Sequence, residues 1–342
     1  MNVLIIGGTH FIGPRVARRL IDDRHSVTLF HRGQTETNLP ASVRHIYGDR
    51  RALSSFASEF KEVAPDIVLD MICYNEREAS DLMRTFKGIA KRVVVASSMD
   101  VYKAYGCLLG LDSGPPDPNP LNEKSPLRES RFTYRAQAKG PDDMAYDYDK
   151  IPVEQAVLRD ADLAGTVLRL PAVYGPGDHR LFEYLKRMDD GRPFILLERN
   201  HAGWRWTRGH VENVAHALAL AVADDRASNR IFNVGEKDAL TEAEWVREIG
   251  RAAGWRGEVV TLPKELMPEH LALPYNFDHH LQGETSSIRS ELGYSESVSR
   301  VEALRETVDW ERAHPPEQLD GARFDYAAED SALERTGSRK DR

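Results

Sequence analysis

The sequence has few cysteines, no long apolar run and fewer basic than acidic residues, and each of these features argues against a class of protein. The two cysteines in 342 residues, Cys73 and Cys107, are too few for a disulfide framework and lack metal-type spacing, so we expect a reducing compartment and no metal site. No run of about 18 apolar residues occurs, which argues against a membrane span. Met1 is followed at once by an apolar strand pattern rather than the basic start of a signal peptide, which predicts a cytoplasmic protein.

Acidic residues outnumber basic ones. The chain carries 54 Asp and Glu against 46 Lys and Arg, a formal net charge of −8. This balance opposes attraction to a nucleic-acid backbone or an anionic lipid surface, so we expect neither partner. Hydrophobic residues make up 41% and charged residues 29%, which is typical of a folded protein, and the length predicts about two domains or one large domain with an appended lobe.

Apolar strand patterns alternate with helix patterns over the first two thirds of the chain. Strands are expected at residues 2–6, 26–30, 43–47, 67–72, 93–96, 165–170 and 230–234, with helices at 12–21, 55–63, 143–158 and 211–223. The alternation predicts an α/β fold, a Rossmann-type doubly wound parallel sheet with right-handed crossovers.

Two units are expected from where this alternation weakens. Residues 1–174 and 203–235 would form the dinucleotide-binding domain, residues 175–202 and 236–323 a smaller C-terminal substrate lobe, and residues 324–342 a disordered tail. The segment 103–141 is dense in Pro, Gly, Asp and Asn and is unusually long for a connection in a compact domain. It is either a lid over a site or a surface insertion.

A glycine-rich turn links the first strand to the first helix. The backbone N–H groups of such a turn, together with the helix N-terminus, can receive a pyrophosphate. Gly7 permits the tight turn, and Gly13 lets the helix pack closely against the sheet. The turn predicts a cofactor site built from Gly7, Thr9, His10, Phe11, Ile12 and Gly13.

The end of the second strand bears on the choice of cofactor. A carboxylate there would favour the free ribose 2′-hydroxyl of NAD, but the chain has Arg32, whose guanidinium can grip a 2′-phosphate, so NADP is favoured over NAD. Asp49, after the third strand, is expected against the adenine amino group. Met71 and Ile72, after the fourth strand, complete the expected cofactor site.

Ser98, Tyr146 and Lys150 form the expected catalytic set. Tyr146 and Lys150 are four residues apart, which would place them on one helical face, where an ammonium lowers the pKa of a phenol. Tyr146 would then move a proton, Lys150 would also hold the nicotinamide ribose, and Ser98 would hydrogen-bond the reacting oxygen. Pro152 leaves an alternative open, because a helix that begins only there separates Tyr146 from Lys150.

These motifs stand in the order found in a known superfamily. The chain resembles the extended short-chain dehydrogenases/reductases, in the branch of NAD-dependent epimerases and dehydratases. The resemblance covers most of the chain and is carried by the glycine turn, by Ser97-Ser98-Met99-Asp100-Val101-Tyr102, by the segment from Tyr146 to Lys150 followed by Glu154, and by Leu168-Arg169-Leu170-Pro171-Ala172-Val173-Tyr174-Gly175.

The resemblance implies a homodimeric enzyme that uses NADP or NAD. It would transfer a hydride at a secondary alcohol carbon of a sugar or sugar-nucleotide-like substrate, with epimerisation as the first expectation. The expected substrate-binding residues are Asp100, Tyr174, His179 and Arg205.

Departures from the family pattern keep alternatives open. His10 stands where members usually have glycine, as in atypical members that include chloroplast stem-loop RNA-binding proteins. Met99 and Asp100 replace the Asp-Glu pair of sugar 4,6-dehydratases, which disfavours dehydration. Arg205 lies one position from the family's diphosphate-binding arginine, so a nucleotide-sugar substrate stays open. The alternative functions are an NADPH-dependent carbonyl reductase and a non-catalytic nucleotide-sensing or RNA-binding protein on the same fold.

Overall fold

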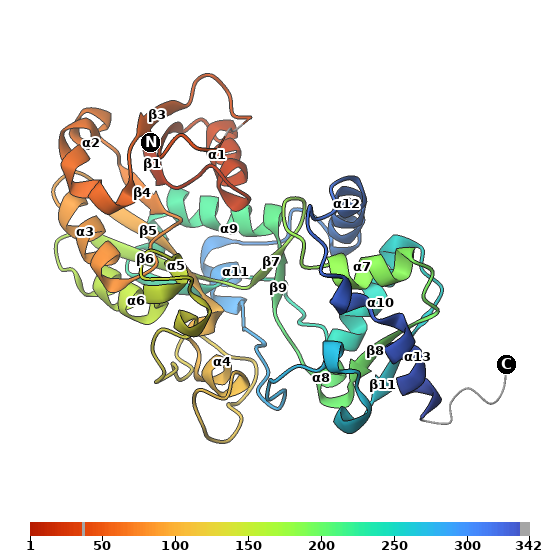
Figure 1. Cartoon of the computed structure of the whole chain (residues 1–342). Helices are drawn as coiled ribbons and strands as arrows, with labels where there is room; N and C mark the ends of the chain where they lie inside the picture. Colours follow the sequence, from red (N-terminus) through yellow and green to blue (C-terminus); the bar gives the residue numbers. More distant parts are fainter. Residues whose placement is uncertain (36–37, 336–342) are drawn as a thin grey trace.

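A seven-stranded, fully parallel sheet forms the centre of the larger domain (Figure 1). The computed structural model describes residues 1–35 and 38–335. The strands are β1 (Asn2–Ile6), β2 (Ser26–His31), β3 (Arg44–Tyr47), β4 (Ile67–Asp70), β5 (Arg92–Ser98), β6 (Ala164–Leu170) and β10 (Arg230–Asn233). Their order across the sheet is β10-β6-β5-β4-β1-β2-β3, so the chain winds outward in both directions from the β1/β4 boundary. The predicted Rossmann-type fold is therefore confirmed.

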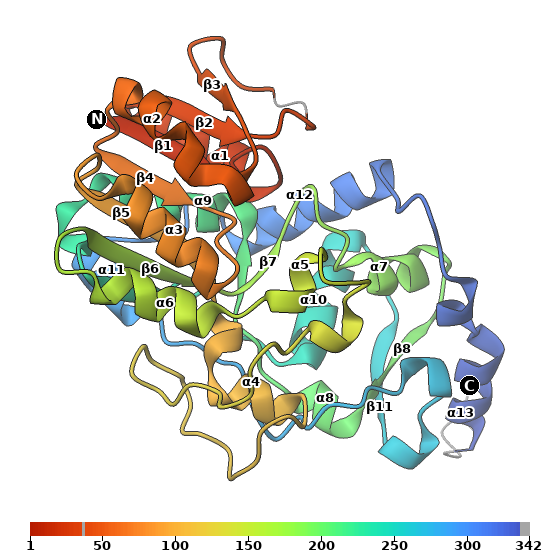
Figure 2. The same ribbon diagram turned by 60° about the vertical axis from the view of Figure 1, so that its left-hand side comes forward.

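Helices cover both faces of this sheet (Figures 1 and 2). One face carries α1 (Ile12–Asp22), α9 (Val211–Ala223) and α11 (Ser286–Leu292), and the other carries α2 (Ala57–Val63), α3 (Glu76–Phe86) and α6 (Lys150–Arg159). The strands are apolar runs rather than alternating ones because both of their faces are buried. Two hydrophobic cores result, one on each side of the sheet.

A smaller lobe lies beside the sheet, toward the carboxyl ends of its strands. Its elements are α7 (Phe182–Asp189), β8 (Phe194–Glu198), α8 (Arg199–Gly203), α10 (Glu242–Ala253), β11 (Glu258–Leu262), α12 (Arg300–Ala313) and α13 (Tyr326–Glu334). All of these elements except α13 contribute to a separate core around Trp245 and Leu304, and α13 packs with β8 and β11 in a smaller apolar cluster. A two-stranded pair, β7 (Ala172–Tyr174) with β9 (Arg208–His210), connects the lobe to the larger domain.

Two segments differ from the expected division of the chain. The tail was expected to be disordered from residue 324, but 326–334 forms α13, whose Ala332 and Leu333 pack on β8 and β11. The last expected tail residues, 336–342, lie outside the described part. Helix α11 was assigned to the lobe, yet its Ile288 and Leu292 belong to the core beneath the large sheet.

The helix expected over residues 143–158 is broken in two. Met144–Asp147 forms the short α5, Tyr148 is extended, and α6 begins afresh at Lys150, where the Asp149 carboxylate caps it by accepting the N–H of Ile151. Pro152 is the physical reason, because a proline is tolerated in the first turn of a helix and disrupts an interior turn. The alternative that Pro152 left open is the one the structure adopts.

The long segment 103–141 contains some structure of its own. It begins with α4 (Lys103–Leu108), and its end runs directly into α5. The remaining short elements are the 3₁₀ turns η1 (Arg50–Phe56), η2 (Met99–Val101), η3 (Arg135–Gln137), η4 (Asp225–Ala227), η5 (Lys264–Leu266), η6 (Glu269–Leu271) and η7 (Gly321–Phe324). Within the described ranges, no helix has the length and apolar content needed to cross a bilayer.

Candidate active site

The glycine turn between β1 and α1 adopts a conformation that side chains would obstruct. Gly7 has a φ of 97°, and a Cβ on Gly13 would lie 2.5 Å from the backbone of Gly8. The first turn of α1 can therefore approach the edge of the sheet closely. Phe11 precedes α1, and no side chain caps the helix. Gly13 donates its N–H to the carbonyl oxygen of His10 at 3.0 Å and Pro14 has no N–H, so in the first turn it is the N–H of Ile12 that is left to face a ligand.

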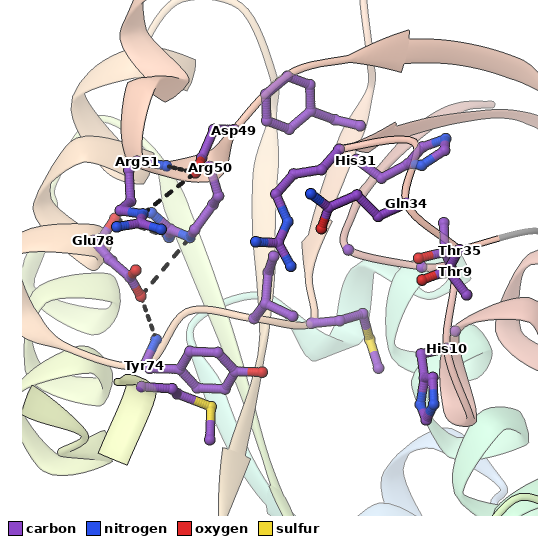
Figure 3. A pocket seen from close by; sticks show the side chains of 18 of the residues that line it. Thr9, His10, His31, Gln34, Thr35, Asp49, Arg50, Arg51, Tyr74 and Glu78 are labelled. Carbon is purple, nitrogen blue, oxygen red and sulfur yellow. Dashed lines mark hydrogen bonds and ion pairs between the residues drawn. The ribbon is translucent and has the colours of Figure 1, made fainter. Parts of the chain in front are cut away.

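A cavity of about 700 Å³ opens over this turn (Figure 3). Its walls come from the turn, from the ends of β2, β3 and β4, and from residues 141–144, so the end of the long segment overhangs it. The volume lies within the range of about 300–1,000 Å³ typical of ligand sites. All the expected cofactor residues except Lys150 line it, namely Gly7, Thr9, His10, Phe11, Ile12, Gly13, Arg32, Asp49, Met71 and Ile72.

The two sides of the cavity differ in their chemistry. Figure 3 shows Thr9, His10 and Thr35 on one side and Arg50, Glu78 and Tyr74 on the other. Arg50 is buried and paired with Asp70 at 2.6 Å, so its charge is already neutralised. Arg32 is exposed at the rim and has no carboxylate partner among the described residues. The cavity thus fits a dinucleotide, with the glycine turn and the start of α1 for its pyrophosphate and Arg32 at one end.

Lys150 lies behind this cavity rather than in its wall. Its ammonium is buried and donates to the carbonyl oxygens of Cys73 (2.8 Å) and Ala96 (2.7 Å), and burial lowers its pKa. The rings of Tyr74 and Tyr148 cover it, with centroids 4.9 and 5.7 Å from Nζ. Of these, Tyr74 lines the cavity.

The expected pairing of Tyr146 with Lys150 is absent. Because the helix breaks at Tyr148, the two residues do not share a face, and the Tyr146 ring instead stacks on the Arg135 guanidinium at 4.6 Å. Arg135 also donates to the backbone carbonyl of Tyr146 at 2.8 Å. Within this segment the tyrosine near Lys150 is Tyr148, two positions after Tyr146, and the ring of Tyr74 lies closer still.

Tyr148 belongs to a hydrogen-bonded cluster around Asp100. The phenols of Tyr148 and Tyr134 both donate to Asp100 Oδ2, at 2.9 and 3.1 Å, and Tyr105 bonds Tyr134 at 2.8 Å. The Ser98 hydroxyl interacts with the Tyr148 phenol and also accepts the N–H of Asp100 at 3.2 Å. Burial raises the pKa of Asp100 and, together with the Asp100 charge, raises that of Tyr148 well above its usual value.

A second cavity of about 450 Å³ lies in the lobe. Its lining is dominated by aromatic and aliphatic side chains, including Trp204, Trp206, Trp245, Tyr105 and Phe277. Tyr105 is also the outer end of the Asp100 cluster, so that cluster reaches the lobe cavity through Tyr105.

The cations of the lobe cavity all have acidic partners. Arg208 pairs with Glu242 in a buried contact, and Arg187 pairs with Glu329 at 3.0 Å. The more exposed pairs are Arg323 with Glu183 and Arg180 with Asp178. His179 and His270 bond Glu311 and Glu329 at 2.8 and 3.2 Å, and burial lowers the pKa of His201. The cavity therefore offers no spare positive charge among the residues that line it.

The expected substrate residues are dispersed. His179 lines the lobe cavity, and Asp100 is the centre of the tyrosine cluster. Tyr174 is buried, donates to Glu236 at 2.8 Å and does not line the cavity. Arg205 also lies outside the lining, with its Nη1 bonded to the carbonyl oxygen of Ala239 at 2.8 Å. The placement of Tyr174 and Arg205 at the substrate is therefore not supported by the geometry.

Sequence reasoning missed Tyr148, Tyr134 and Tyr105. For Tyr148 the sequence does contain a signal, which is Pro152. A proline limits how far α6 can extend toward the N-terminus, so Tyr146 falls outside that helix and does not share a face with Lys150. Tyr134 and Tyr105 carry no such signal, since their contacts with Asp100 arise from the path of an irregular segment.

Comparison with known proteins adds a family and a set of relatives. The model of the NAD-dependent epimerase/dehydratase family matches residues 3–235. The chain is 28% identical to 2′-dehydrokanamycin reductase of Streptomyces kanamyceticus over 79% of this chain and 72% of that protein. It is 24% identical to the chloroplast stem-loop binding protein of 41 kDa b of Arabidopsis thaliana, over 90% and 78%. The structure of MoeE5 in complex with UDP-glucuronic acid and NAD superposes with a TM-score of 0.65 at 21% identity, covering 92% of this chain and 99% of that one, and shares its fold.

Proposed function

Because the chain belongs to the NAD-dependent epimerase/dehydratase family, we propose that it is an NAD(P)-dependent oxidoreductase acting at a secondary alcohol carbon of a sugar-like substrate. The observation that carries the proposal is the position of the Asp100 cluster. Tyr74 connects it to the cavity over the glycine turn, and Tyr105 connects it to the cavity in the lobe. A group that exchanges a proton with the substrate oxygen while the dinucleotide exchanges a hydride with its carbon must lie where the two sites meet.

The residues of the first cavity would hold the dinucleotide. The start of α1 would receive its pyrophosphate, Asp49 would face the adenine, and Met71 and Ile72 would pack against the adenosine. When bound, the nicotinamide supplies or accepts the hydride. Ser98 would hydrogen-bond the reacting oxygen, and Lys150 would supply positive charge near that oxygen. In this structure the Lys150 ammonium donates to the carbonyl oxygens of Cys73 and Ala96.

The lobe cavity supports a sugar-like substrate without phosphate groups. Its paired arginines leave no free guanidinium for a diphosphate, whereas its tryptophans offer the flat apolar surfaces on which sugar rings pack. Among its relatives, one reductase acts on 2′-dehydrokanamycin and one probable epimerase on UDP-glucuronate. Because the arginines of the lobe cavity are already paired with carboxylates, we expect a substrate like 2′-dehydrokanamycin rather than one that carries a diphosphate.

Two reactions fit this site. Epimerisation would remove a hydride and return it to the other face of the carbonyl, with no net consumption of cofactor. Simple reduction is the second candidate, and Arg32 favours it, since a guanidinium at the end of β2 suits a dissociable 2′-phosphorylated cofactor, NADPH.

The test begins with the nucleotide. Mass spectrometry of the nucleotide released from the purified protein, followed by fluorescence titration with NADPH and NADH, would establish binding and preference. A panel of hydroxy and keto sugars, aryl glycosides and sugar nucleotides would then be followed at the nicotinamide absorbance band. Net absorbance change indicates reduction, and product inversion without it indicates epimerisation. Absence of dinucleotide binding, together with tight retention of RNA, would refute the proposal in favour of an RNA-binding function.

A further inference from the structure

Resting on the proposed hydride transfer, we infer that Tyr148, and not Tyr146, exchanges a proton with the substrate oxygen, and that Asp100 acts through Tyr148 as the residue that stores this proton. The inference rests on the contacts of Tyr148 with Asp100 and Ser98 and on its closeness to Lys150. Tyr146 has none of these contacts, because its ring lies on Arg135.

The position of Tyr148 suits contact with a ligand. Lys150 and Asp100 are buried, whereas the Tyr148 side chain is partly exposed. Its ring lies 6.0 Å from that of Tyr74, which lines the dinucleotide cavity, and 5.1 Å from that of Tyr134. Tyr148 itself lines neither cavity, but it adjoins both Tyr74, in the wall of the dinucleotide cavity, and Tyr134, which bonds Tyr105 of the lobe cavity.

Asp100 has the surroundings of a group that can hold or release a proton. Its Oδ2 accepts from both Tyr148 and Tyr134, while its Oδ1 is buried without a partner among the described residues, so ionisation is only partly compensated. Burial raises the pKa of Asp100, and the charges of Arg128 and Lys150 oppose this rise.

The charges around the cluster come from every element packed on it. Arg128 donates to the backbone oxygen of Asp100 at 2.9 Å and pairs with the buried Asp149 at 3.0 Å, and Arg131 also contacts Asp149. Lys150 faces the cluster from the start of α6. Because burial, and after it the carboxylate next to it, raise the pKa of Tyr148, this phenol stays protonated and passes a proton on, instead of resting as a phenolate.

The step balances as a two-proton relay. In the oxidation direction, the substrate hydroxyl gives its proton to Tyr148 Oη as Tyr148 gives its own proton to Asp100 Oδ2. The C–H electron pair leaves as hydride to an oxidised nicotinamide dinucleotide, and the C–O bond becomes a carbonyl. In reduction, with the reduced dinucleotide as hydride donor, the protons move back from Asp100 through Tyr148 to the oxygen. Tyr134 and Tyr105 connect Asp100 to the lobe cavity, from which it can be reprotonated.

The first experiment compares Tyr148→Phe with Tyr146→Phe in the full-length protein. The probe is whichever carbonyl compound of a keto-sugar and aromatic-ketone panel the wild type reduces fastest with NADPH or NADH. Tyr148→Phe should lower kcat by about 10²–10⁴-fold while leaving dinucleotide binding unchanged, and Tyr146→Phe should retain kcat near wild type. The matched control is Tyr326→Phe on α13, whose phenol bonds Asp190 and which lines neither cavity. Loss of kcat in Tyr146→Phe with full activity in Tyr148→Phe would overturn the assignment.

The second experiment needs no substrate. Tyrosines labelled with ¹³C at Cζ report their own ionisation by NMR, and the Tyr148 signal is assigned by its absence in Tyr148→Phe. Asp100→Asn removes the neighbouring carboxylate, so Tyr148 should titrate at clearly lower pH than in the wild type. An unchanged Tyr148 titration would rule out the coupling. Failure of the wild type to bind either dinucleotide would refute the proposed function instead, and the NMR result would still decide the Asp100–Tyr148 coupling.

Discussion

Neutralising Glu329 should destabilise the lobe far more than its place near the end of the chain would indicate. The Glu329 side chain is fully buried on α13 and bonds Arg187 Nε at 3.0 Å and His270 Nε2 at 3.2 Å. Arg187 is 3% exposed, and its other two nitrogens donate to the backbone oxygens of Glu183 and Arg323. Glu329→Gln keeps the shape and one acceptor but leaves the buried guanidinium without its counter-charge.

The expected loss is about 3 kcal/mol, the lower end of the range for breaking one side of a buried ion pair, because the amide oxygen can still accept from Nε. This is a large share of the roughly 5–15 kcal/mol that stabilises a folded protein. Urea unfolding followed by far-ultraviolet circular dichroism would measure it, as a lower midpoint at an unchanged slope. Asp330→Asn is the matched control, because its partly exposed pair with Arg192 should contribute no more than about 1 kcal/mol. Equal losses of unfolding free energy in Glu329→Gln and Asp330→Asn would refute the reasoning. If the unpaired charge of Arg187 is the cause, the double variant Arg187→Met with Glu329→Leu should recover much of the unfolding free energy that Glu329→Gln loses.

Three further outcomes are expected. Gly13→Ala should abolish dinucleotide binding in a fluorescence titration while the protein stays folded. The reason is that the new Cβ would lie 2.5 Å from the Gly8 backbone and push α1 away from the turn. Binding near the wild-type level would contradict this geometry. Arg32→Ala should weaken NADPH binding about 10- to 100-fold and leave NADH binding nearly unchanged, and equal effects on both would remove Arg32 from the 2′-phosphate. Burial, with a smaller effect of Arg15, lowers the pKa of His210 from 6.5 to about 4. As the pH falls, His210 therefore gains its proton first in the unfolded chain, and the free energy of unfolding should drop by about 3 kcal/mol between pH 6.5 and 4 because of this residue. His210→Leu should flatten the dependence of the unfolding free energy on pH in that range. An unchanged dependence in the variant would argue against this role of His210.

Local patterns were sufficient for the scaffold because the scaffold is built from local rules. Continuous apolar strands separated by helices lead to a parallel sheet, and the glycine turn after β1 must face the edge where parallel strands end. Ten of the eleven residues expected at the cofactor therefore line one cavity. Their contact with a dinucleotide stays a prediction, as does the role of Ser98 at the end of β5. Lys150 was expected to hold the nicotinamide ribose, but it lies outside the lining of that cavity and bonds two backbone carbonyls, which were not foreseen.

The spacing of Tyr146 and Lys150 gave the wrong partner because spacing predicts contact only inside an unbroken helix. One proline and one capping aspartate ended that helix and turned Tyr148 toward Asp100. A sequence-based prediction had to weigh the pair against Pro152, and only the folded chain decided between them.

The sequence by itself determined the sheet, the glycine turn and the residues that meet at the ends of the strands, since each depends on neighbours within a few positions. The tertiary structure alone decided that α13 docks on the lobe, that every arginine of the lobe cavity has an acidic partner, and that Tyr148 and Tyr74, rather than Tyr146, lie beside Lys150. These contacts join residues far apart in the chain, such as Arg187 and Glu329, whose attraction depends on shared burial and leaves no periodic trace in the sequence.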